Sequence, residues 1–174
     1  MDSYTFRTEE QGGGPGPAVE GKYQKGQPAW FRAADVEFYR DGDRLAYRHG
    51  GRWLRSRTGI LSDPLPVLAA AAAVRGARLP HEELAALDGH LQDVGPAEAA
   101  RVLARSEHRA VARGGTVRLW VDAGGHVTKY EIRIRLQGRL GDAEVDGTAT
   151  RSVTLSGRGS TRVEVPAGAR KALE

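Results

Sequence analysis

The clearest structural signal in the chain lies in nine residues that read Thr128-Lys129-Tyr130-Glu131-Ile132-Arg133-Ile134-Arg135-Leu136. In an extended chain, Tyr130, Ile132, Ile134 and Leu136 fall on one face and the charged side chains fall on the other. A period of two that lasts this long is typical of a strand with one buried and one solvated face. The stretch therefore predicts a half-buried sheet in the second half of the chain.

Strand signals continue on both sides of this stretch. Residues 116–122 are rich in strand-forming side chains, and Ala123-Gly124-Gly125 after them favours a tight turn. Further strands are expected at 146–156 and 160–165, with a turn at Gly157-Arg158-Gly159 between them. The second strand block of the prediction covers residues 107–166.

The first 60 residues predict a meander of short strands. Extended segments are expected at 4–8, 19–24, 29–32 and 35–40. Asp41-Gly42 is a strong two-residue hairpin signal because glycine tolerates a positive φ. Leu45 and Tyr47 alternate on the return strand, and Gly50-Gly51 turns the chain again before Trp53.

Between the two strand blocks, residues 62–106 predict helices. Ser62-Asp63-Pro64 combines a capping side chain, an early carboxylate and a proline whose missing N–H costs nothing at a helix start. This helix should run to about Arg75, a second helical turn should begin at Leu79, and a third helix should end by Ser106. The order of strands, helices and strands predicts an α+β fold, in which helices cover one face of a curved antiparallel sheet. We expect one domain over residues 1–172, and a vector remnant is one interpretation of Leu173-Glu174.

Composition excludes several kinds of site. The chain of 174 residues has no cysteine, which excludes disulfides, thiolate zinc sites and cysteine nucleophiles. Its formal charge of +4 is compatible with a nucleic acid or an anionic membrane surface as partner, but the arginines are scattered along the strands rather than gathered in blocks. A solvated basic face is the simpler interpretation.

No motif nominates a catalytic, metal or cofactor residue. The segment Gly16 to Tyr23 is close to a phosphate-binding loop, but a tyrosine replaces the small hydroxyl that would bind magnesium. His81-Glu82-Glu83 resembles the start of a zinc-protease helix and lacks a second histidine four positions after the first. Ser156 to Ser160 does not have the order of a nucleophile elbow. We therefore expect no enzyme activity, no metal and no cofactor.

The large aromatic side chains leave three interpretations open. They can pack in the core, stack nucleic-acid bases on a sheet surface, or form the wall of an apolar cleft between sheet and helices. The rings are Tyr23, Trp30, Phe31, Phe38, Tyr39, Tyr47, Trp53, Trp120 and Tyr130.

Two hairpin patterns resemble a known family. Residues Val117 to Val127, which contain Trp120-Val121-Asp122, are similar to the "W-[IV]-D-x-x-G-x-[VL]" hairpin of bacterial envelope lipoproteins of the LppX/LprG type, within the LolA-like superfamily. Residues Ser152 to Pro166 resemble the closing hairpin of these proteins, and Asp43 to Trp53 resembles an upstream strand pair. The likeness covers residues 35–166 at the level of pattern.

The resemblance implies a half-open β-barrel whose apolar cavity carries an acylated lipid or a lipoprotein in the periplasm or at the outer side of the cell envelope. It implies a monomer that contacts lipid and membrane surfaces, with no nucleic-acid partner, and a signal segment that would precede the sequence. A ligand-free interaction or sensor domain, and a basic single-strand nucleic-acid binder, are the alternatives. The residues expected to line the cavity are Phe38, Tyr47, Trp53, Leu68, Leu103, Trp120, Tyr130, Ile132 and Ile134.

Overall fold

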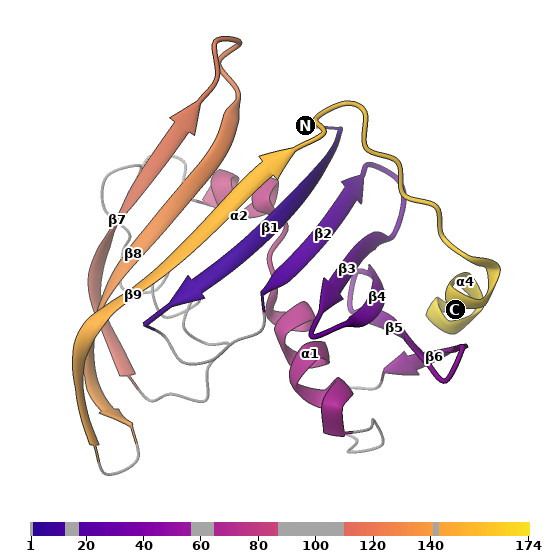
Figure 1. Ribbon diagram of the computed structural model, residues 1–174, viewed down its shortest axis with the longest axis horizontal. Helices are drawn as coiled ribbons and strands as arrows, with labels where there is room; N and C mark the ends of the chain where they lie inside the picture. Colours follow the sequence, from indigo (N-terminus) through magenta and orange to yellow (C-terminus); the bar gives the residue numbers. More distant parts are fainter. Residues whose placement is uncertain (1, 13–17, 57–64, 87–109, 141–142) are drawn as a thin grey trace. The chain divides into compact units, whose positions relative to one another are not determined.

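The structure is a computed structural model that describes residues 2–12, 18–56, 65–86, 110–140 and 143–174 (Figure 1). The described residues form nine strands and three short helices. The strands are β1 (Ser3–Gln11), β2 (Val19–Gln24), β3 (Ala29–Ala33), β4 (Val36–Asp41), β5 (Arg44–His49), β6 (Arg52–Ser56), β7 (Ala110–Val121), β8 (Val127–Leu140) and β9 (Ala143–Ser156), and the helices are α1 (Leu65–Gly76), α2 (Pro80–Ala86) and α4 (Ala167–Leu173).

All nine strands belong to one antiparallel sheet with the order β6-β5-β4-β3-β2-β1-β9-β8-β7 (Figure 1). The sheet is not closed, because β6 and β7 stand at its two ends and do not pair with each other. The predicted α+β class, an antiparallel sheet with a few short helices, is confirmed.

Contacts divide the chain into two compact units. The first unit contains residues 1–7, 17–77 and 155–174, and the second contains residues 8–16 and 78–154. The first unit therefore holds the meander with α1 and α4, and the second holds β7, β8, most of β9 and α2.

The first unit confirms the predicted meander. Phe31, Phe38 and Tyr47 are successive register partners on β3, β4 and β5, and all three are buried. Gly42, Gly50 and Gly51 have positive φ values in the turns that the sequence predicted. The strands extend one or two residues beyond the predicted bounds at several ends, which is the usual uncertainty of strand limits.

Helix α1 packs on the face of the meander that carries Phe31. Val67, Ala70, Ala71 and Val74 are its buried residues, and their small side chains let the helix lie close to β3 and β4. Arg40 of β4 donates through Nη1 to the carbonyl oxygen of Val74 (2.8 Å) and to that of Ala77. The Val74 carbonyl also accepts from the N–H of Ala77 (3.3 Å), so Arg40 adds a side-chain donor to the carbonyl oxygens at and just after the C-terminal end of α1.

The chain after β9 differs from the prediction. Residues 160–165 were expected to form a strand, but residues 161–166 pair with no strand and lead into helix α4, which the sequence did not predict. Side chains satisfy this backbone instead, since Gln24 Oε1 accepts from Val163 N (2.9 Å) and Tyr39 donates its hydroxyl to Glu164 O (2.6 Å). Alternation of valine and polar residues predicts a paired strand, whereas the segment is extended without strand pairing.

Helix α4 packs on the face of the meander opposite α1. Its buried residues Ala169 and Leu173 join Tyr39, Ala46 and Val163 in one apolar cluster. Arg44 also donates to the carbonyl oxygen of Leu173 (2.9 Å), so the end of the chain is attached to β5. The end of the chain is therefore part of the core of the first unit.

The second unit is built on β7, β8 and β9, which are longer than predicted. The register between β7 and β8 shifts between Ala112 and Gly115 and again between Trp120 and Val121. Glycines at 114 and 115 weaken the strand signal, which is why the sequence placed the start of β7 at 116 rather than 110. The helix start at Ser62 and the third helix ending by Ser106 lie outside the described residues. In the described part of the chain, no helix is long and apolar enough to cross a membrane.

Candidate functional site

The second unit has a buried face that combines residues from three adjacent strands. Register pairs Val117 of β7 with Ile132 of β8, and Ile132 with Arg151 of β9. Tyr130 and Ile134 lie two positions to either side of Ile132 on β8, so they share its face. The buried face consists of Val117, Tyr130, Ile132, Ile134, Ala149, Arg151 and Val153, all of which are buried.

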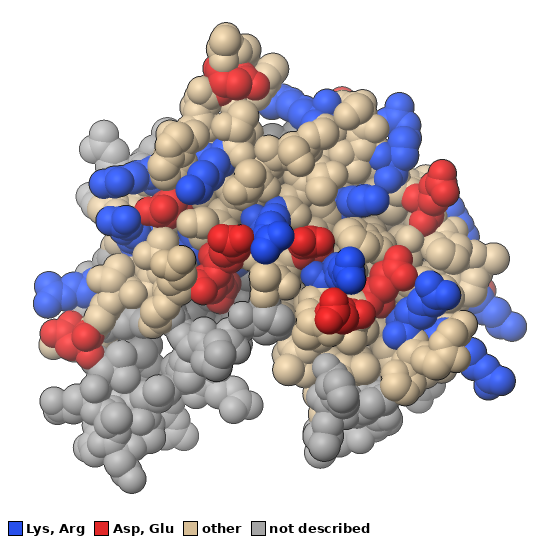
Figure 2. Space-filling model, viewed as in Figure 1, with Lys and Arg blue, Asp and Glu red and all other residues tan. Residues whose placement is uncertain are grey.

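The opposite face of the same strands is polar. On β8 it carries Lys129, Glu131, Arg133 and Arg135, and on β9 it carries threonines, serines and Asp146. Arg133 pairs with Glu131 at 2.9 Å, and Arg135 lies 3.7 Å from Asp146. Figure 2 shows basic and acidic side chains interspersed on the side of the molecule turned to the viewer, without a continuous patch of one sign. On this view the scattered arginines do not form a basic block.

Arg151 is a cation in the middle of the buried face. Its side chain is only 2 % exposed, and so is that of Glu83 on α2. Arg151 Nε lies 3.2 Å from Glu83 Oε1, and Nη2 donates to Glu83 Oε2 at 3.3 Å. Nη1 donates to Glu10 Oε1 at 3.0 Å, and the Tyr130 hydroxyl donates to Glu83 Oε2. We refer to Glu10, Glu83, Tyr130 and Arg151 as the Arg151 cluster.

Each member of the cluster comes from a different element of the second unit. Glu10 lies on β1 two positions after the buried Thr8, so it points to the same side. Glu83 is placed by the first turn of α2, where the N–H groups of Glu82 and Glu83 donate to the carbonyl oxygen of Leu79 at 2.9 and 3.0 Å. The Glu82 carboxylate in turn accepts a hydrogen bond from the N–H of Leu79 at 3.1 Å, so Leu79 and Glu82 are joined by hydrogen bonds in both directions.

The electrostatics of the cluster keep the guanidinium charged. Burial acts to lower the pKa of Arg151, but the charges of Glu83, Tyr130 and Glu10 outweigh it and raise the pKa above its usual value. With two carboxylates around one guanidinium, the cluster has no excess of positive charge. On α2, burial is the main cause that lowers the pKa of the half-buried His81.

Three of the predicted cavity residues meet on the buried face. Tyr130, Ile132 and Ile134 lie side by side on β8 and are at most 1 % exposed. Phe38 and Tyr47 are placed together in the first unit, with ring centroids 6.4 Å apart.

The other predicted residues do not join either group. Trp53 lies on the opposite face of the meander from Tyr47, with its ring 5.2 Å from that of Tyr39, because the register pairs Tyr47 with Leu54. Trp120 pairs with Lys129 on the polar face and is 41 % exposed. Leu68 is half-buried on α1, and Leu103 lies outside the described residues.

Sequence reasoning missed Arg151 and Glu83, although β9 contains a signal for one of them. In β9 the buried positions are Ala149, Arg151, Val153 and Leu155, and the intervening positions are threonine or serine. An arginine on the apolar side of such an alternation predicts a buried charge that needs a partner. Glu83, four positions after buried Leu79, was a candidate partner.

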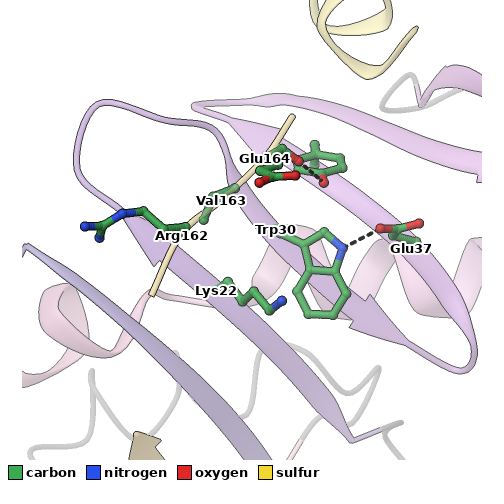
Figure 3. A pocket seen from close by; sticks show the side chains of 7 residues that line it. Lys22, Trp30, Glu37, Arg162, Val163 and Glu164 are labelled. Atoms are coloured by element: carbon green, nitrogen blue, oxygen red, sulfur yellow. Dashed lines mark hydrogen bonds between the residues drawn. The ribbon is translucent and has the colours of Figure 1, made fainter. Parts of the chain in front are cut away.

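A second feature is a pocket of about 330 Å³ in the first unit (Figure 3). Trp30 Nε1 donates to Glu37 Oε1 at 2.7 Å, and the Lys22 amino group lies 5.1 Å from the centre of the Trp30 ring. Burial, with the charges of Glu37 and Glu164, raises the pKa of Tyr39 in its wall to about 12. The pocket is lined by Lys22, Trp30, Glu37, Tyr39, Arg162, Val163 and Glu164. Its lining is polar and aromatic, in contrast to the buried face of the second unit.

The described residues contain no group of three or more histidine, aspartate or glutamate side chains placed to hold a metal ion. His49 and His126 are exposed beside glycine turns. His126 instead takes part in a turn in which Asp122 accepts from the N–H groups of Gly124 (2.8 Å) and His126 (3.0 Å). The backbone hydrogen bond from His126 is the main cause that lowers the pKa of Asp122.

Comparison with known proteins gives one similar solved structure. No family model matches the chain, and no curated protein sequence matches it. The crystal structure of the Mycobacterium tuberculosis lipoprotein LppX is similar over 94 % of this chain and 90 % of that chain, with a TM-score of 0.49 and 14 % sequence identity.

Proposed function

We propose that this domain is a non-enzymatic binding module that holds a lipid or acyl chain against the buried face of the second unit. The observation that carries the proposal is that the buried face is apolar at Val117, Ile132, Ile134, Ala149 and Val153, which lie on three adjacent strands. Each methylene group of a ligand that such a face removes from water contributes roughly 0.8 kcal/mol of favourable binding free energy. A chain of a dozen methylenes therefore has enough apolar area to bind without any covalent step.

The proposed setting is the extracytoplasmic side of a bacterial envelope, with a lipid or an acylated lipoprotein as partner. It is supported by the resemblance of residues 117–127 and 43–53 to the hairpins of LppX/LprG-type proteins. On the side of the molecule that Figure 2 shows, basic and acidic side chains are interspersed, which favours a lipid over a nucleic acid as the partner of that side, because nucleic-acid binding relies on concentrated positive charge.

Native mass spectrometry after mild purification tests the proposal. We expect additional mass that organic extraction removes and that lipid analysis identifies as acyl chains. Ile134→Trp places a larger side chain on the buried face while keeping it apolar, so it should reduce the bound lipid. Arg133→Ala on the polar face is the matched control and should leave the lipid unchanged.

Two results would contradict the proposal. One is a folded protein with a clean apo mass that also fails to bind an added long-chain alcohol. The other is equal lipid content in the two variants, with unchanged circular dichroism. Either result would favour the ligand-free interaction domain, and binding of single-stranded DNA that falls steeply with salt would favour the nucleic-acid binder.

A further inference from the structure

The position of Arg151 is the unusual feature of the buried face. Its register partner is Ile132, and Ala149 and Val153 flank it on its own strand. Burying a guanidinium among such side chains is unfavourable, and an apolar side chain at this position would pack without needing a partner. The arginine therefore calls for an explanation other than stability of the sheet.

The donors around Glu83 form a site for a carboxylate. Arg151 presents the Nε and Nη2 edge of its guanidinium, the planar fork that matches the two oxygens of a carboxylate. The Tyr130 hydroxyl donates to the same oxygen as Nη2. Thus three donors from β8 and β9 converge on one carboxylate in a face that is otherwise apolar.

Glu83 fills this site imperfectly. Arg151 Nε is 3.2 Å from Glu83 Oε1, yet the direction is outside hydrogen-bond geometry, so the buried Nε–H makes no hydrogen bond to any residue that the structure describes. The position of the Glu83 carboxylate is constrained by α2, a helix of seven residues. A carboxylate that is not attached to this helix is free to align with both edges of the fork.

The charge balance decides whether a ligand carboxylate would join Glu83 beside Arg151 or replace it. Glu10 already holds Nη1 of Arg151 at 3.0 Å, so a further anion beside both glutamates would place three negative charges around one guanidinium. Exchange of one carboxylate for another leaves the net charge unchanged, and the donors of Arg151 and Tyr130 keep an acceptor.

We propose that the fork of Arg151 and the hydroxyl of Tyr130 recognise the carboxylate of a fatty acid, which takes the place of Glu83 while its chain lies along Val117 and Ile132. This inference rests on the proposed function and names its ligand class, an acyl chain with an anionic end. Glu83 is then a positioning residue that holds the donors in place until the ligand exchanges with it.

The test compares a charged and a neutral probe of the same length, dodecanoate and dodecanol, by isothermal titration calorimetry on the full chain. In the unchanged protein, dodecanoate should bind at least tenfold more tightly than dodecanol. Arg151→Met should reduce this ratio to about one, and Tyr130→Phe should reduce it in part. Arg133→Met on the polar face is the control and should preserve the ratio.

Glu83→Gln supplies an outcome that a purely structural role does not give. Because it removes the competing charge at nearly constant shape, it should bind dodecanoate more tightly than the unchanged protein and dodecanol equally well. This variant keeps the test decisive if Arg151→Met fails to fold, which circular dichroism would show.

The inference is overturned if both probes bind the unchanged protein equally, or if folded Glu83→Gln shows no gain in dodecanoate affinity. Failure of both probes to bind is a different result, because it refutes the proposed lipid-binding function itself.

Discussion

Leu173→Ala tests whether the C-terminal helix α4 belongs to the core of the first unit. Leu173 is 4 % exposed and packs with Tyr39, Ala46, Val163 and Ala169. Truncating a buried leucine to alanine costs about 2–5 kcal/mol, depending on how far the site collapses around the cavity. Because Leu173 is at the end of a helix and the chain, partial collapse is easy, and we expect a loss of about 2–3 kcal/mol of unfolding free energy.

The assay is urea denaturation followed by tryptophan fluorescence, since Trp53 packs against the same cluster. Lys171→Ala is the matched control, because Lys171 is exposed on the same helix and its truncation should change stability by less than about 0.5 kcal/mol. The backbone carbonyl that accepts from Arg44 is present in both variants. A loss for Leu173→Ala as small as that of the control would refute the packing of α4 as described.

Three further predictions concern other parts of the molecule. Arg151→Met should lower the unfolding free energy by about 3–5 kcal/mol in urea titrations, because it leaves the buried Glu83 without its cationic partner. The double variant that also carries Glu83→Leu should recover most of the lost free energy. No recovery would contradict the ion pair between Arg151 and Glu83. In the unfolded chain Tyr39 ionises near the ordinary tyrosine pKa of 10.0, whereas burial raises its pKa to about 12 in the folded state. The contribution of Tyr39 to stability is therefore intact below pH 10 and is lost between pH 10 and 12. Tyr39→Phe should flatten that part of a profile of unfolding free energy against pH. Gly21→Ala should lower the thermal midpoint, with a cost of about 1–3 kcal/mol, because the new Cβ would overlap the Phe6 ring, and an unchanged midpoint would show that the ring moves freely.

The sequence predicted most of the sheet because its strands alternate strongly and their turns contain glycine. It did not predict α4, which has only seven residues and whose N-cap, Pro166, makes no capping side-chain hydrogen bond. A helix this short shows too little periodicity to be recognised.

The candidate site could be predicted only in part. The alternation of β8 placed Tyr130 and Ile132 correctly on one face, but it says nothing about which distant carboxylate reaches Arg151. Trp53 and Tyr47 lie on opposite faces of the meander because the register pairs Tyr47 with Leu54, and a shift of one residue in register moves a side chain to the other face of a sheet. The alternation of a single strand does not contain the register with its neighbour.

The two ends of the sheet affect how the protein behaves in concentrated solution. At one end, β6 has only five residues, and Arg52 and Arg55 on it are exposed. At the other end, β7 is long, but its pairing with β8 is interrupted by two register shifts, which bend a strand and increase its twist. Among the described strands, neither rim is a long, flat row of free donors and acceptors, so edge-to-edge growth into aggregates is discouraged although the sheet is open.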